Sequence, residues 1–274
     1  MSAPDIYFLH IHKTAGTSFG ELIRKAYKAE EILPARDCPE LSRFSREEFN
    51  RYRCFIGHFG TAPFSLLDRE IPCVTILRDP FEQTVSNIRH IARDIPWLRT
   101  AQWVWEKVRI PALRRIMQTG YVRVMIEEYQ TRSLGVDVDI NPYIGRRVPP
   151  APVLQQLTRG QRMEEVFARA KRRLDSMPVV GTAERFAETM ELLCDHLGIP
   201  APEAPPEYNI GPGRKLHQSY RQSGDVSPDL TALIDCHTAY DRELHAYASQ
   251  LLDQRLARKR ATDALNVASN VGRG

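Results

Sequence analysis

Apolar residues along the chain follow two alternating patterns. Short continuous apolar runs, typical of buried strands, occur at residues 6–9, within 53–60, at 74–77 and at the start of 177–199. Segments with apolar residues at helical spacing begin at Phe19, Phe81, Phe186 and Leu230. This alternation predicts an α/β protein with a parallel sheet of about four or five strands, flanked by helices.

The first predicted strand leads into the loop HIHKTAGTSF, residues 10–19. Gly16 permits tight backbone geometry, and Thr17 and Ser18 are good N-cap residues for the helix that follows. The N–H groups of such a helix start would point outward and, with the charge of Lys13, form a site for a phosphate-like anion. The predicted anion-binding residues are Lys13, Thr14, Ala15, Gly16, Thr17 and Ser18.

A second segment, CVTILRDPFEQTVSNIRH (73–90), has a similar organisation. An apolar strand ends at Arg78, Pro80 suits the first turn of a helix, and Ser86 lies two turns further on. Arg78 and Ser86 could therefore reach one anion above the edge of the sheet. In the simpler alternative, Arg78 and Asp79 form a local ion pair and Ser86 is an exposed helix residue.

These two motifs, K-T-A-G-T-S and R-D-P with a serine further on, resemble the 5′-phosphosulfate and 3′-phosphate motifs of sulfotransferases. These enzymes use 3′-phosphoadenosine-5′-phosphosulfate (PAPS). The likeness is strongest to carbohydrate sulfotransferases of the heparan-sulfate 2-O and 6-O type and their bacterial relatives. It covers roughly residues 5–92 and 177–252. The resemblance implies a P-loop-like three-layer α/β/α fold with PAPS as co-substrate and no required metal ion. The implied acceptor is a hydroxyl group, expected on a carbohydrate or glycolipid.

The resemblance also implies roles for particular residues. Carbohydrate sulfotransferases carry a Gly-His like Gly57-His58, and its histidine is assigned as the base that deprotonates the acceptor. His58 is thus the expected base, with His12 as the alternative, and Lys13 is expected at the leaving phosphate. A basic loop closes over the nucleotide in these enzymes, which makes Arg214 and Lys215 candidates for the 3′-phosphate.

Two other functions stay open. The strand at 74–77 with Asp79 could belong to a kinase or nucleoside triphosphatase, with Asp79 holding magnesium. Such proteins carry a Gly-Lys-Ser/Thr sequence in the phosphate loop, however, and this chain has none. A domain that binds nucleotide or glycan without chemistry is the second alternative.

Length and charge refine the picture. With 274 residues, 42% of them hydrophobic, the chain is expected to form one domain over 1–254, with a mostly helical insertion at about 97–175 over the carboxyl edge of the sheet. A flexible basic tail is expected at 255–274. Residues 99–173 hold fifteen Lys or Arg against seven Asp or Glu. This surplus fits either solvated helix faces or contact with an anionic acceptor. Nucleic acid is not expected as a partner.

Membrane and redox signals complete the analysis. No stretch is long and apolar enough for a membrane span, and a strand begins by residue 6, so we expect a cytoplasmic protein without a signal peptide. Peripheral membrane contact and the oligomeric state are left open. The five cysteines show no metal-type spacing and are expected to be reduced: Cys38, Cys54, Cys73, Cys194 and Cys236.

Overall fold

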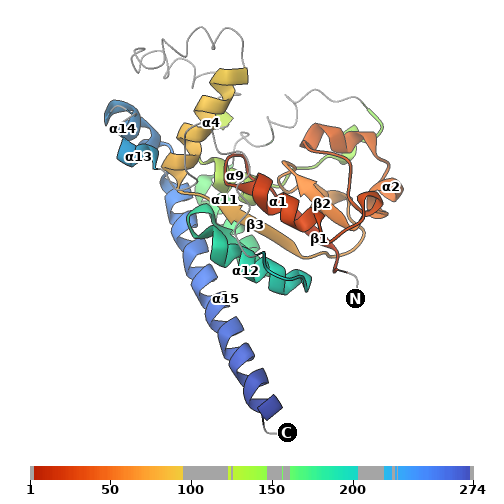
Figure 1. Cartoon of the computed structure of the whole chain (residues 1–274). Coiled ribbons are helices and arrows are strands. Elements are labelled where there is room, and N and C mark those ends of the chain that lie inside the picture. The colour runs from red at the N-terminus through yellow and green to blue at the C-terminus, as the bar shows by residue number, and fades with distance from the viewer. Residues whose placement is uncertain are drawn as a thin grey trace.

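The structure, a computed structural model, describes residues 3–94, 123–124, 126–146, 156, 161–202, 219–223, 226 and 228–271. At its centre lie four parallel strands in the order β2-β1-β3-β4, flanked by helices (Figure 1). The strands are β1 (Ile6–Leu9), β2 (Cys54–Gly57), β3 (Cys73–Leu77) and β4 (Val179–Thr182). The expected α/β protein with a parallel sheet is confirmed.

The helices that the structure describes follow the chain in order. Those before residue 100 are α1 (Gly16–Arg24), α2 (Arg46–Asn50), α3 (Pro63–Leu66) and α4 (Pro80–Asp94). Those after residue 125 are α9 (Tyr129–Gly135), α11 (Met163–Ser176), α12 (Phe186–Leu197), α13 (Tyr220–Ser223), α14 (Pro228–Cys236) and α15 (Ala239–Val271). Short 3-10 turns lie at Ala29–Glu31, Cys38–Arg43, Asn141–Tyr143 and Ala183–Arg185.

Two hydrophobic clusters pack against the sheet, because successive side chains of a strand point to opposite faces. Tyr7 and Leu9 belong to one cluster, which also takes residues of α9 and α11. Ile6 and Phe8 belong to the other, which takes residues of α1 and α12. All four strands are buried along their whole length, as a parallel sheet covered on both faces requires.

The C-terminal helices differ from the sequence prediction. The apolar stripe from residue 230 to 251 predicts one long helix, but the structure divides it into α14 and α15. Where the helix would continue, the carboxylate of Glu128 accepts hydrogen bonds from the N–H groups of Tyr240 and Asp241 and caps a new helix start. Residues 255–271, expected as a flexible tail, continue α15 as helix and extend beyond the body of the molecule (Figure 1).

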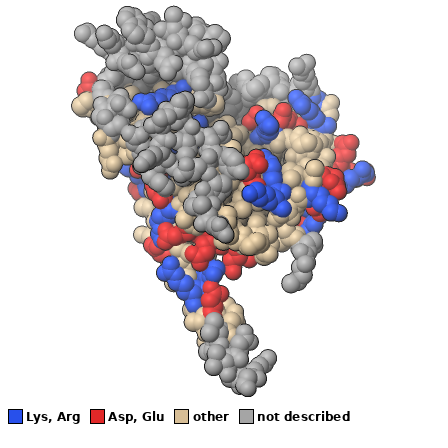
Figure 2. Space-filling model, in the orientation of Figure 1, with Lys and Arg blue, Asp and Glu red and all other residues tan. Residues whose placement is uncertain are grey.

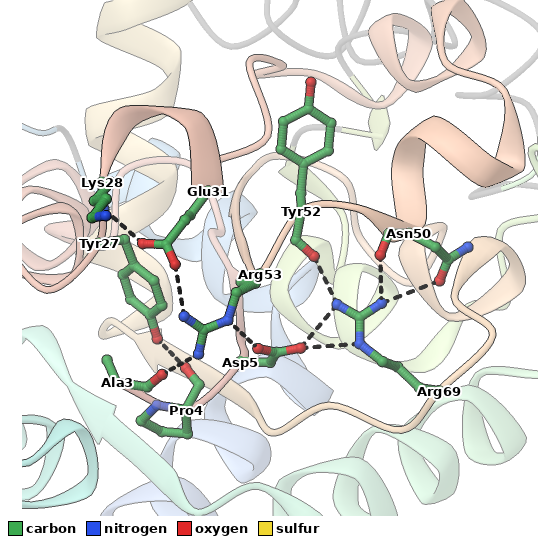
Figure 3. A network of polar contacts seen from close by, with 10 residues as sticks. All are labelled: Ala3, Pro4, Asp5, Tyr27, Lys28, Glu31, Asn50, Tyr52, Arg53 and Arg69. Carbon is green, nitrogen blue, oxygen red and sulfur yellow. Dashed lines mark hydrogen bonds and ion pairs between the residues drawn. The ribbon is translucent and has the colours of Figure 1, made fainter. Parts of the chain in front are cut away.

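At the amino-terminal edge of the sheet, polar contacts tie the starts of the strands together (Figure 3). Asp5 lies just before β1, and its carboxylate accepts from Arg53 at 2.9 Å and from Arg69 at 3.0 Å. Arg53 also donates to Glu31 at 2.7 Å. These contacts lie at the edge of the sheet opposite to the carboxyl ends of the strands.

The described parts of the insertion are mostly helical. Helix α9 reaches the carboxyl end of β3, where its residue Gln130 contacts Arg78, and α11 packs against α9 and α15. Arg169 and Arg173 of α11 form ion pairs with Asp137. On the face shown in Figure 2, many of the coloured Lys and Arg lie beside Asp or Glu. Several described charges of the basic segment are thus held in ion pairs within the fold, and residues 97–117 lie outside the described residues.

The described cysteines are all free thiols, as expected, and only Cys236 is exposed. Among the described helices, none is long and apolar enough to cross a membrane.

Candidate functional site

The loop after β1 has an unusual backbone. Lys13 and Ala15 both adopt positive φ angles, 67° and 65°, although neither is glycine. Helix α1 starts at Gly16, so Thr17 and Ser18 lie inside its first turn, and the N-cap is Ala15, which has no side chain to cap with. The prediction that Thr17 or Ser18 caps the helix is therefore wrong. The first N–H groups of α1 still point out of the helix start, as an anion site requires.

Gly16 is needed for a different reason than the sequence suggests. Its φ is not positive, so the chain does not use the backbone freedom of glycine here. A Cβ atom at this position would instead lie 2.0 Å from Cδ2 of His10. Gly16 thus permits the start of α1 to press against the ring of His10. The buried hydroxyl of Thr14 is used within the loop, where it donates to the carbonyl of Ile11 at 2.9 Å.

Three neighbouring strands bring the main predicted residues together. The carboxyl ends of β2, β1 and β3 lie side by side, since Leu9 is in register with Gly57 of β2 and Thr75 of β3. His58 therefore follows β2, Lys13 follows β1 and Arg78 follows β3 at one edge. Nη1 of Arg78 donates to the carbonyl of Lys13 at 3.2 Å, which joins the two predicted anion-binding loops.

A cluster of three histidines lies beside this loop. The rings of His12 and His58 stack with centroids 3.3 Å apart and planes 15° apart, and the ring of His10 lies 4.2 Å from that of His58. Nδ1 of His58 is 2.8 Å from the carbonyl oxygen of His10. Because a carbonyl only accepts, Nδ1 carries the proton in neutral His58, and Nε2 keeps the free lone pair.

Burial keeps these imidazoles neutral. Burial lowers the pKa of His12 to about 2 and that of His10 well below its usual value. The charge of His58 contributes a smaller shift in the same direction. Burial also lowers the pKa of His58, although the hydrogen bond to His10 and the charge of Asp37 oppose that shift. At neutral pH the cluster therefore offers lone pairs rather than positive charge.

The same cluster contains a set of metal-ligand types. His12, His58 and Asp37 each place one ligand atom within 4.8 Å of the other two. The lone pair of an imidazole nitrogen lies in the plane of its ring, however, and the two rings are stacked almost parallel. Their lone pairs therefore run side by side instead of meeting at one point, so these residues as placed do not form a converging coordination set.

The ion pair of Arg78 differs from the one in the simpler interpretation of the R-D-P motif. Arg78 forms its ion pair with Glu82, at 3.6 Å, while the carboxylate of Asp79 accepts from the N–H of Glu82 and caps α4. Pro80 is the first residue of α4, as predicted. Ser86 is half-buried on the same helix, one turn beyond Glu82. The carboxylate of Asp79 is thus committed to a helix start.

One residue of the site escapes the sequence analysis. The fully buried side chain of Gln130 accepts from the N–H of Arg78 at 3.0 Å and donates to its carbonyl at 2.8 Å. The only sequence signal is a polar residue at the start of a helical segment, which is too common to single it out. Arg214 and Lys215, the other predicted cations, lie outside the described residues.

No protein-family model matches this chain, and a search of the curated proteins gives no match either.

Proposed function

We propose that this protein is a sulfotransferase that moves a sulfuryl group from PAPS to a hydroxyl group of a carbohydrate or glycolipid. One observation carries the proposal: Lys13, His58 and Arg78 follow three neighbouring parallel strands at one edge of the sheet. Ligands of open α/β sheets bind at this edge, where the strand order changes direction. The proposal includes a P-loop-like three-layer arrangement, a reaction that requires no metal ion, and a cytoplasmic location.

The chemistry sets three requirements. The acceptor oxygen forms a bond to sulfur while the bond from sulfur to the 5′-phosphate oxygen of PAPS breaks, which leaves adenosine 3′,5′-bisphosphate and a sulfate ester. Negative charge grows on the leaving oxygen, so fixed cations and N–H donors there lower the barrier. Lys13 supplies the cation, and the first N–H groups of α1, with the exposed hydroxyl of Thr17 and that of Ser18, supply donors.

The third requirement is a base for the acceptor proton. His58 meets it, because its Nδ1–H is held by the carbonyl of His10 and its Nε2 is left to take a proton. Its lowered pKa keeps it in the neutral form that a base needs. His12, stacked on His58, is the alternative base.

The kinase alternative receives less support from the geometry. A Walker-type aspartate must present its carboxylate to magnesium, but that of Asp79 accepts from the N–H of Glu82 at 3.0 Å. A binding protein without chemistry differs from an enzyme only in turnover, so an activity assay separates the two.

Ligand-induced stabilisation gives the first test. Adenosine 3′,5′-bisphosphate without magnesium should raise the melting temperature, and a ligand at 100 times its Kd adds about 2.7 kcal/mol of stability. ATP with magnesium should do much less. Lys13→Ala should abolish the shift, while Arg69→Ala, at the opposite edge of the sheet, should keep it. Equal or greater stabilisation by ATP with magnesium would favour the kinase.

Transfer itself is then measured with radiolabelled PAPS and a panel of hydroxyl acceptors that includes polysaccharides, glycolipids and simple alcohols. Label that moves to an acceptor supports the enzyme. Tight binding of adenosine 3′,5′-bisphosphate with no transfer to any acceptor would support the binding protein instead.

A further inference from the structure

The backbone of Arg78 is held by a side chain from a distant segment. Arg78 directly follows β3, and its N–H and carbonyl groups both bond to the amide of Gln130. The amide thus acts like a short piece of neighbouring strand, and it prolongs the ordered backbone by one residue beyond the sheet. Because Gln130 is fully buried, water cannot replace these bonds.

Gln130 is in turn fixed by a carboxylate in α15. The N–H groups of Gln130 and Thr131 donate to the two oxygens of Asp241, at 3.1 and 2.7 Å. Asp241 is also fully buried. The start of α9 is therefore anchored to the start of α15, and it has no freedom to carry Gln130 away from Arg78.

The guanidinium of Arg78 makes weaker contacts than its backbone. It donates to the Lys13 carbonyl at 3.2 Å and lies 3.6 Å from a carboxylate oxygen of Glu82. Neither contact is the bidentate pairing that locks an arginine side chain. The position of the guanidinium thus depends mainly on where the backbone holds its Cα atom.

We propose that Gln130 is a positioning residue, which holds Arg78 so that its guanidinium meets the 3′-phosphate of the bound nucleotide. This inference rests on the proposed function. It states that the preference for a nucleotide with a 3′-phosphate over one without depends on Gln130 as well as on Arg78. Gln130 touches no ligand in this scheme and acts only through Arg78.

The test compares the Kd values of adenosine 3′,5′-bisphosphate and adenosine 5′-monophosphate, measured by isothermal titration calorimetry. For the wild type, the bisphosphate should bind more tightly by roughly 10- to 100-fold, the value of a charge-assisted contact. Arg78→Ala should remove this preference. Gln130→Ala should remove most of it while leaving the Kd of the monophosphate unchanged.

Gln83→Ala is the matched control. Gln83 is an equally buried amide near the site, but it donates to the carbonyl of His12 instead of holding the backbone of Arg78. The control variant should keep the preference for the bisphosphate, whatever stability it loses. If Gln130→Ala does not fold, Gln130→Met, which keeps the volume without the hydrogen bonds, takes its place.

The outcomes separate the two hypotheses. A wild type that binds both nucleotides equally would overturn the proposed function and this inference with it. A preference that is lost in Arg78→Ala but retained in Gln130→Ala or Gln130→Met would overturn the inference alone. A preference lost equally in Gln83→Ala would also overturn it, because any buried amide would then serve.

Discussion

The guanidinium of Arg78 donates a hydrogen bond to the backbone carbonyl of Lys13, at 3.2 Å. In this contact Lys13 accepts through its backbone carbonyl, and its side chain takes no part. Two cationic residues thus follow adjacent strands, and Arg78 holds the loop that carries Lys13. This arrangement suits a ligand with two separate anionic groups better than a ligand with one.

The backbone of Lys13 leads to the first prediction. A side chain at φ 67° costs about 1–2 kcal/mol, which glycine does not pay. Lys13→Gly should therefore be more stable than Lys13→Ala by about 1 kcal/mol, as measured by chemical denaturation. Both variants should lose sulfuryl transfer. Equal stability of the two would mean that the left-handed conformation is absent in solution, and full activity of Lys13→Gly would remove the ammonium group from the mechanism.

The second prediction concerns the contact between Gly16 and His10. A methyl group at residue 16 must displace the His10 ring, which stacks on Phe8 and also touches His58. Gly16→Ala should cost about 1–3 kcal/mol of stability and should slow transfer. Gly20→Ala, in the same helix, is the control. Its Cβ would lie 3.3 Å from a methyl group of Ile56, and the helix gains from alanine, so a change near zero is expected.

The third prediction separates binding from chemistry. His58→Ala should retain affinity for adenosine 3′,5′-bisphosphate but lose turnover by about 10²- to 10⁴-fold, the usual contribution of a general base. The wild-type kcat/KM should rise with pH through a pKa below 6.5, because burial lowers the pKa of His58 and only the neutral ring accepts a proton. The variant should lack this rise. Loss of the rise in His12→Ala, with His58→Ala still active, would transfer the role of base to His12.

The fourth prediction concerns stability against pH. Glu128 caps α15, while Asp241 caps α9, so two buried carboxylates lie at one junction. Burial, with the charge of Asp241, raises the pKa of Glu128 to about 7, and burial also raises that of Asp241. The folded state therefore holds the proton more tightly than the unfolded state does.

Stability from this source is full below about pH 4.3, the ordinary value for glutamate, and is lost as the pH rises toward 7. The loss is on the order of 3 kcal/mol. Glu128→Gln should flatten this part of the curve of unfolding free energy against pH. An unchanged slope in the variant would show that Glu128 titrates as an ordinary carboxyl group.

The sequence predicts the sheet well because its signals are local. Apolar runs mark the four strands, and Pro80 marks the start of α4. The motif residues Lys13, His58 and Arg78 can be placed at one edge, since the ends of parallel strands share it. These predictions need only the order of elements along the chain.

Other features depend on contacts that the sequence does not display. Gly16 has a packing role that is visible only once the ring of His10 is in place. Gln130 bonds to a residue 52 positions earlier, from a segment with no recognisable motif. The break between α14 and α15 depends on Glu128, more than 100 residues before it. Each of these features is fixed by tertiary packing, which overrides local preference.

The link between Asp241 and α9 has a consequence for the order of folding. The carboxylate that fixes Gln130 lies 111 residues further along the chain, so during synthesis the first three strands leave the ribosome long before it does. Contacts between such distant residues close large loops and form late. The hydrophobic sheet can therefore collapse early, whereas the backbone of Arg78 acquires its lasting partner only when α15 docks. A nascent chain that ends before residue 241 should therefore lack the preference for the bisphosphate over the monophosphate.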